Sequence, residues 1–149
     1  MNTKELIYTK YISQLEETFI KGYYFETAWL EYVLLEDRLV SLLKSSGGHL
    51  DNQAKEIKMM GPKLGKLNER YKTIKILKDQ LDRKDLINRL DKWKNSRNTL
   101  MHSMADGSLT ITQIENQIRE LAESGIALVR DTASTARRLK KINKKGNVK

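Results

Sequence analysis

The chain has 149 residues, the size of one ordinary domain whose hydrophobic core needs no crosslinks. It contains no cysteine, which excludes disulfides, thiolate nucleophiles and cysteine-ligated zinc. Its formal net charge is +9 at pH 7, a sign typical of proteins that bind polyanions.

The first ten residues, MNTKELIYTK, are polar and charged, unlike a signal peptide. No stretch of the sequence approaches the roughly 20 apolar residues that are needed to cross a bilayer. We therefore expect a soluble, cytoplasmic protein that has no membrane partner.

Apolar residues three or four positions apart predict two helices at the start of the chain, over about residues 3–21 and 25–44. Gly22 lies between them and favours a helix end. The segment SSGGHLDN at 45–52 then ends the helical pattern. We expect the second helix to bury one stripe, which consists of Phe25, Ala28, Trp29, Tyr32, Leu35, Leu39 and Leu43.

The middle of the chain predicts a weak helical stretch over 53–60 and two further helices, over 62–81 and 83–104. Pro62 is compatible with the first turn of the third helix, where its missing N–H leaves no hydrogen bond unmade. Asp82 is the expected N-cap of the fourth helix.

The last helix begins with a capping box, in which Thr110 is the expected N-cap and Gln113 its partner. Its apolar stripe is long and consists of Ile118, Leu121, Gly125, Val129, Thr132, Ala136 and Leu139. The predicted fold class is therefore all-α, an up-down helical bundle of four to five helices with a long C-terminal helix, over residues 1–142. The basic segment 143–149 is expected to be a frayed tail.

The segment KNSRNTLMHS at 94–103 places a permanent cation in the apolar stripe of the fourth predicted helix. Arg97 has its apolar neighbours within roughly 60°, at about 100° per residue. A buried guanidinium requires a carboxylate, a phosphate or a wet cleft, because it keeps its charge. His102 lies about 140° and Asn98 about 100° from Arg97 around the helix, on one flank of the apolar stripe. His102 and Asn98 are four residues apart, so their side chains are neighbours on this flank.

A purely structural interpretation explains the same residues. Glu36 lies in the middle of the stripe of its own helix, which makes it the expected ion-pair partner of Arg97. His102 is then an ordinary histidine in the last turn of a helix, where the helix dipole favours it.

Residues Arg97 to His102, R-N-T-L-M-H, resemble the signature of the HEPN superfamily, named for higher eukaryotes and prokaryotes nucleotide-binding. That signature is an arginine, a polar residue, three further residues and a histidine, late in a helical bundle and before a long helix. The segment ETAWLEYVLLEDRLVSLLKS at 26–45 is also similar to the second helix of many small prokaryotic members.

The resemblance implies a metal-independent endoribonuclease without a cofactor, acting as a toxin or an antiviral defence component. In this reaction the 2′-hydroxyl of RNA attacks the adjacent 3′-phosphate, which leaves a 2′,3′-cyclic phosphate and a 5′-hydroxyl. Arg97 would stabilise the phosphorane, His102 would transfer protons, and Asn98 would orient the phosphate or the imidazole. One chain supplies one such histidine, so we expect a homodimer through the fourth helix. An antitoxin or regulatory protein is a further expected partner.

Two basic segments are candidates for contacts with RNA. Residues 55–97 carry a net charge of +8 and residues 132–149 carry +7, whereas 1–54 and 98–131 each carry −3. A merely solubilising surface explains the same pattern. The candidates are Lys63, Lys66, Arg70, Lys72, Lys75, Lys92, Lys94, Arg137, Arg138, Lys140 and Lys141.

Two functions besides the nuclease stay open. A non-catalytic HEPN-like bundle would bind nucleic acid, nucleotide or a protein partner, since many superfamily members have lost activity. A plain helical interaction protein would use Arg97 and Glu36 as a structural pair. The nuclease requires Arg97 and His102 to line an open cleft, whereas an Arg97 sealed against Glu36 favours the interaction protein.

Overall fold

The computed structural model describes residues 2–145, which form six α-helices. They are α1 (Thr3–Ile20), α2 (Tyr24–Ser45), α3 (Met60–Thr73), α4 (Lys75–Asp82), α5 (Leu86–Asp106) and α6 (Ile111–Lys144). The all-α prediction is confirmed, although the predicted count of four to five helices is too low. The first two residues of the predicted tail at 143–149 end α6, and residues 146–149 lie outside the described part.

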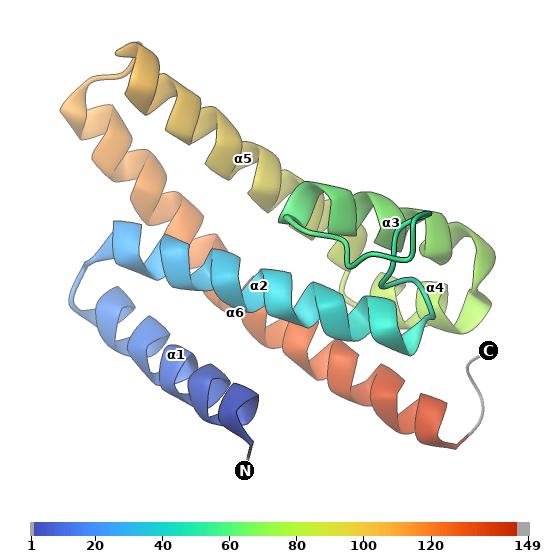
Figure 1. Cartoon of the computed structure of the whole chain (residues 1–149). Helices are drawn as coiled ribbons and strands as arrows, with labels where there is room; N and C mark the ends of the chain where they lie inside the picture. Colours follow the sequence, from blue (N-terminus) through green and yellow to red (C-terminus); the bar gives the residue numbers. More distant parts are fainter. Residues whose placement is uncertain (1, 146–149) are drawn as a thin grey trace.

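Helix α6 is the central element of the molecule (Figure 1). The chain turns back between α1 and α2 and again between α5 and α6, and α2 runs beside α6 in the same direction. The α2–α6 interface is the most extensive of the fold, so a simple up-down order of neighbouring helices is not confirmed. Among residues 2–145, no helix has the length and apolar composition to span a bilayer.

Local signals explain where the longest helix begins. The side chain of Thr110 accepts a hydrogen bond from the Gln113 amide at 3.2 Å, and the Gln113 side chain accepts one from the Thr110 amide at 2.9 Å. This confirms the predicted capping box. Gly107 ends α5 with a φ of 72°, a conformation that glycine adopts without steric cost.

The segment between α2 and α5 differs from the prediction. Residues 53–59 are not helical, which differs from the predicted weak helix over 53–60, and Met60 already belongs to α3. The Asp51 carboxylate accepts hydrogen bonds from the amides of Gln53 and Lys55, which holds a turn at the start of this segment. The predicted helix over 62–81 is broken at Ile74, whose backbone is extended. The two β-branched residues Thr73 and Ile74 lower helix propensity at this point.

Asp82 ends α4 and does not cap α5, so the predicted N-cap is wrong. Its carboxylate accepts hydrogen bonds from the Tyr71 hydroxyl at 2.5 Å and from Lys78 at 2.8 Å. Helix α5 instead follows Asp85, whose backbone is left-handed and whose side chain makes no capping hydrogen bond.

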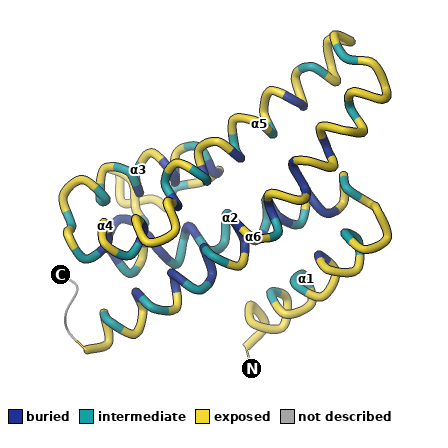
Figure 2. Tube along the Cα trace, turned by 180° about the vertical axis from the view of Figure 1, so that it is seen from behind, coloured by how far each residue is buried: buried dark blue, intermediate teal, exposed yellow. Residues whose placement is uncertain are grey.

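The core lies where the inner faces of the helices meet α6, whose predicted stripe is buried throughout (Figure 2). The predicted stripe of α2 is buried only in part, since Phe25 is 48% and Trp29 71% exposed. Likewise, α5 buries Leu90 and Trp93 but exposes Met101. The cause is α3, which packs against the C-terminal half of α2 and the N-terminal half of α5 and leaves their other halves uncovered.

Candidate functional site

Next to the N-terminal end of α3, one side of α2 and one side of α5 are left uncovered. We call this surface the bare face. Residues three or four positions apart lie on one side of a helix, and a contact between Arg97 and Tyr32 joins the two helices. The bare face consists of Phe25, Trp29 and Tyr32 from α2 and of Arg97, Met101 and Met104 from α5.

Arg97 is held on this face by an aromatic ring. Its guanidinium carbon lies 4.2 Å from the centroid of the Tyr32 ring, a cation–π contact, and its Nη1 donates to the side chain of Asn98 at 3.4 Å. The Tyr32 hydroxyl accepts a hydrogen bond from the Met60 amide at 3.4 Å, which connects the ring to the start of α3. The side chain of Arg97 is therefore positioned without a carboxylate.

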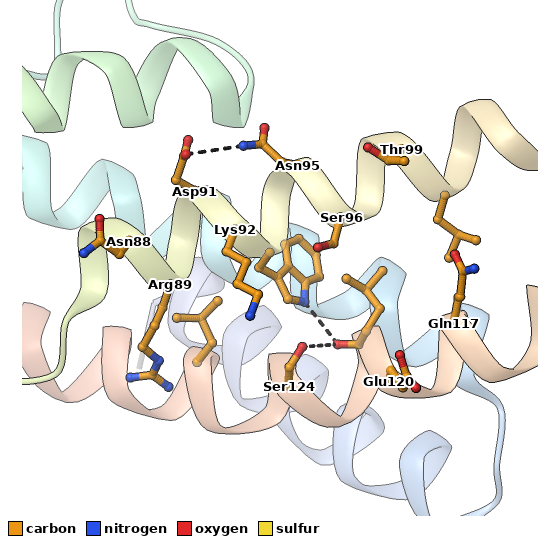
Figure 3. A pocket seen from close by; sticks show the side chains of 14 residues that line it. Asn88, Arg89, Asp91, Lys92, Asn95, Ser96, Thr99, Gln117, Glu120 and Ser124 are labelled. Atoms are coloured by element: carbon orange, nitrogen blue, oxygen red, sulfur yellow. Dashed lines mark hydrogen bonds between the residues drawn. The ribbon is translucent and has the colours of Figure 1, made fainter.

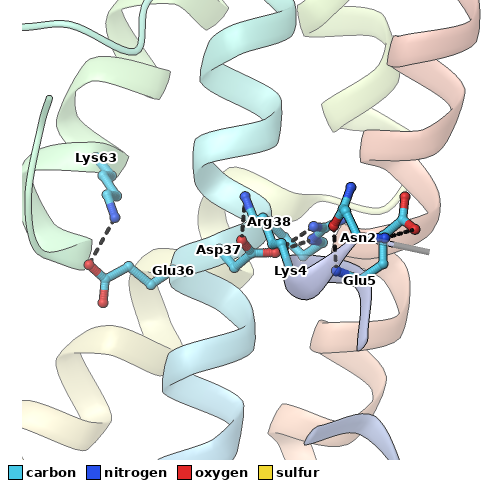
Figure 4. Close-up of polar contacts among 7 residues, drawn as sticks. All are labelled: Asn2, Lys4, Glu5, Glu36, Asp37, Arg38 and Lys63. Atoms are coloured by element: carbon cyan, nitrogen blue, oxygen red, sulfur yellow. Dashed lines mark hydrogen bonds and ion pairs between the residues drawn. The ribbon is translucent and has the colours of Figure 1, made fainter. Parts of the chain in front are cut away.

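The predicted ion pair between Arg97 and Glu36 is wrong. Glu36 binds the Nζ of Lys63 at 2.8 Å instead, and Lys63 is only 6% exposed (Figure 4). Helix α3 carries Lys63 to this side of α2. The pairing also removes Lys63 from the candidate RNA contacts, because its ammonium group is already bound inside the fold.

His102 is exposed near the C-terminal end of α5. Hydrogen bonds from Ser108 lower the pKa of Asp106, which lies one turn after His102. No hydrogen bond joins His102 to Arg97 among residues 2–145. The described residues thus bring Arg97 and Asn98 together, and His102 has no hydrogen bond to either of them.

The other predicted cations divide into engaged and unengaged side chains. Arg70 donates to the carbonyl of Ser46, and Arg138 donates to Gln80 and Thr135, so both have roles inside the fold. Lys66 and Lys94 lie within 3.4 Å and 3.3 Å of carboxylates on their own helices. The exposed remainder consists of Lys72, Lys75, Lys92, Arg137, Lys140 and Lys141.

A hollow of about 1030 Å³ lies between α5 and α6 (Figure 3). Its lining combines amides and hydroxyls such as Asn95 and Thr99 with charges of both signs, including Lys92 and Glu120. The indole of Trp93 donates to the Leu121 carbonyl at 3.2 Å at its base. Neither Arg97 nor His102 lines this hollow, so it is separate from the predicted site.

Sequence reasoning missed one titratable residue, Glu31 of α2. Its side chain is fully buried against α6, and neither carboxyl oxygen has a hydrogen-bond partner among residues 2–145. Burial raises its pKa to about 9, so the group is a neutral acid at pH 7. A Cβ built at Gly125 would lie 2.1 Å from the Glu31 Cδ, which shows how closely the two helices approach. A signal that could have indicated this contact is Gly125, a glycine within the apolar stripe of a predicted helix.

Among residues 2–145, no group of three or more histidine, aspartate or glutamate side chains is placed to hold a metal ion. Comparison with known proteins yields no relative, since no protein-family model, curated protein or solved structure matches the chain. The resemblance to the HEPN superfamily therefore depends on the residues from Arg97 to His102 and on the segment at 26–45, and it stays a prediction.

Proposed function

We propose that this protein is a HEPN-type, metal-independent endoribonuclease that cleaves RNA by attack of the 2′-hydroxyl. A role as a toxin or antiviral defence component, a cytoplasmic location and control by an antitoxin or regulatory protein belong to the same proposal. The observation that carries it is Arg97, a cation with no carboxylate partner among residues 2–145, held on Tyr32 at an uncovered surface beside an exposed histidine.

The three side chains have distinct chemical tasks. The phosphorane formed by attack of the 2′-hydroxyl carries extra negative charge, which the fixed Arg97 guanidinium stabilises. His102 removes the proton from the 2′-hydroxyl or delivers one to the 5′-oxygen that leaves. Asn98, hydrogen-bonded to Arg97, orients the phosphate. The products are a 2′,3′-cyclic phosphate and a 5′-hydroxyl.

A homodimer through α5 supplies the second histidine. Cleavage moves two protons, and a two-fold pairing of bare faces sets two copies of Arg97 and His102 around one cleft. The exposed apolar side chains of Trp29 and Met101 support this pairing, because contiguous apolar patches on soluble proteins mark interaction surfaces. The substitution Met101→Glu at the bare face is expected to shift the sedimentation profile from dimer to monomer and to abolish cleavage. A wild-type protein that sediments as a monomer and still cleaves would contradict the composite site.

The deciding experiment is cleavage of end-labelled single-stranded RNA in EDTA. We expect wild-type protein to produce cyclic-phosphate ends, and Arg97→Ala and His102→Ala each to slow cleavage by about 100-fold or more. Arg83→Ala and His49→Gln, which change the same residue types elsewhere, are the matched controls and should cleave as wild type. Cleavage that persists in both site variants, or that requires a divalent metal, overturns the mechanism. RNA binding without any cleavage favours the non-catalytic bundle.

A further inference from the structure

A second groove, of about 710 Å³, lies between α1, α2 and the C-terminal end of α6. Its charged lining is almost entirely positive, with one carboxylate, Glu5, against six cations. We call it the basic groove. The cations are Lys4, Arg38, Lys44, Arg137, Lys140 and Lys144.

Neighbouring carboxylates neutralise only part of this charge. Asp37 binds Lys4 at 2.8 Å and also pairs with Arg38 (Figure 4). Glu5 accepts a hydrogen bond from the Asn2 amide in the capping box of α1. The other four cations of the groove have no carboxylate of residues 2–145 within 4 Å. A positive potential therefore remains along the groove, and it attracts polyanions.

The cations follow two helices that run in the same direction (Figure 1). Arg137, Lys140 and Lys144 recur every three or four residues along α6, so they form a row about 10 Å long at 1.5 Å per residue. Arg38 and Lys44 are six residues apart on α2, about 9 Å along its axis, and both line the groove. One small anion would contact only a part of these rows, whereas consecutive phosphates of a chain would contact them along their length.

The wall of the groove contains a hydrogen-bond donor without a partner. The hydroxyl of Tyr8 is buried and makes no hydrogen bond among residues 2–145. Burial raises the pKa of Tyr8, which keeps the hydroxyl protonated and therefore able to donate. Arg38 lies 4.4 Å from the centroid of the Tyr8 ring and covers it. The ring offers no platform for stacking a base, so recognition here depends on phosphates rather than on bases.

We propose that the basic groove binds the phosphate backbone of single-stranded RNA without regard to base sequence. The choice of RNA rests on the proposed nuclease function, whereas the groove itself rests on its own residues. None of the residues of the bare face lines the groove. The groove and the bare face are therefore separate surfaces, and the groove would hold a part of the RNA away from the cleavage site.

Binding can be measured with a fluorescent 2′-O-methyl oligouridine, which lacks the attacking hydroxyl and stays uncleaved by wild-type protein. We expect Arg137→Ala combined with Lys140→Ala to weaken binding about tenfold at 0.1 M salt and to reduce the slope of log affinity against log salt by about 1.4. The matched control is Arg130→Ala combined with Lys84→Ala, which removes the same charge from exposed positions elsewhere and should bind as wild type.

Two further binding measurements, with a Tyr8→Phe variant and with an acidic peptide, test the chemistry of the ligand. Tyr8→Phe should weaken binding several-fold without lowering the thermal midpoint, and binding equal to wild type would overturn the role of the hydroxyl. An acidic peptide should bind more weakly than the RNA analogue, and the opposite preference would overturn the RNA assignment. Groove variants that bind like their control while wild-type cleavage is intact overturn the groove alone. Groove-dependent binding without any cleavage supports the groove and contradicts the nuclease.

Discussion

Two residues of α2, Trp29 and Glu31, lie in environments opposite to those that their side chains prefer. The indole of Trp29 is 71% exposed, whereas the Glu31 side chain is fully buried and its carboxyl group has no hydrogen-bond partner in the described part of the chain. Local conflicts of this kind are expected at functional or strained sites. The comparison shows that this half of α2 contributes to two surfaces. One packs inside the fold against α6, and the other is the bare face that we assign to a second copy.

The largest expected effect on stability concerns Glu31, the buried residue of the two. The pKa of Glu31 is raised to about 9 from an ordinary value of 4.5, so the folded protein keeps a proton that the unfolded chain releases between these pH values. The contribution of Glu31 to stability is therefore highest below pH 4.5 and falls as the pH rises toward 9. Glu31→Gln should stabilise the protein by about 3 kcal/mol at pH 7 and leave stability at pH 4 unchanged.

Urea unfolding from pH 4 to pH 9 checks this effect. Glu26→Gln removes the same charge from an exposed position of α2 and should follow the wild-type pH dependence. If wild type and Glu31→Gln lose stability in parallel across this range, the neutral buried acid is refuted.

Gly125 tests how tightly Glu31 is enclosed. Gly125→Ala should destabilise the protein by about 2 kcal/mol, because the new methyl group overlaps the Glu31 carboxyl. In a Glu31→Ala background the same change should cost much less, as a double-mutant cycle would measure. Gly65→Ala is the control, since a Cβ at that exposed position of α3 meets no atom within 4 Å. It should raise stability slightly, and additive effects of Gly125→Ala and Glu31→Ala would contradict the contact.

Tyr32 belongs to the bare face and follows the buried Glu31 in the sequence. Tyr32→Leu removes the ring beneath Arg97, and we expect it to cost about 1 kcal/mol of stability and to reduce cleavage. Tyr32→Phe keeps the ring and loses the hydroxyl that accepts from Met60, so it should retain cleavage. Thermal unfolding and RNA cleavage of both variants separate the two contributions. Equal cleavage by the Leu and Phe variants would show that the ring does not position Arg97.

The smallest effect on stability is expected at Trp29, the exposed residue of the two. Trp29→Ala should change stability by less than about 0.5 kcal/mol, because the indole makes little contact within the chain. It should nevertheless weaken self-association in sedimentation experiments. Leu39→Ala, at a fully buried position of the same stripe, should cost about 2 to 5 kcal/mol. A loss of stability in Trp29→Ala as large as in Leu39→Ala would mean that the bare face is part of the core.

Signals within a single element were predictable from the sequence. The capping box of Thr110 and Gln113 and the stripe of α6 depend on residues close together in the chain, and both agree with the structure. For the same reason the position of Arg97 on its own helix, next to Asn98, was predictable. Such signals require no knowledge of how the helices pack against one another.

Partners from different elements were not predictable in the same way. The stripe pattern showed that Glu36 and Arg97 each needed an interaction, but it did not show that α3 would bring Lys63 to Glu36 and leave Tyr32 to Arg97. The prediction of which stripe residues are buried was partly wrong for the same reason. Trp29 and Leu39 belong to one predicted stripe, yet Trp29 is exposed and Leu39 is buried, since α3 covers only the C-terminal half of α2.

The close approach of Glu31 and Gly125 has a consequence for the evolution of the chain. With a glutamate at position 31, any side chain at position 125 overlaps the carboxyl group, whereas a small residue at position 31 makes room for one. The two positions should therefore substitute as a pair in homologous sequences, although 94 residues separate them. Coupled substitution at these positions would identify distant relatives that retain the packing of α2 on α6.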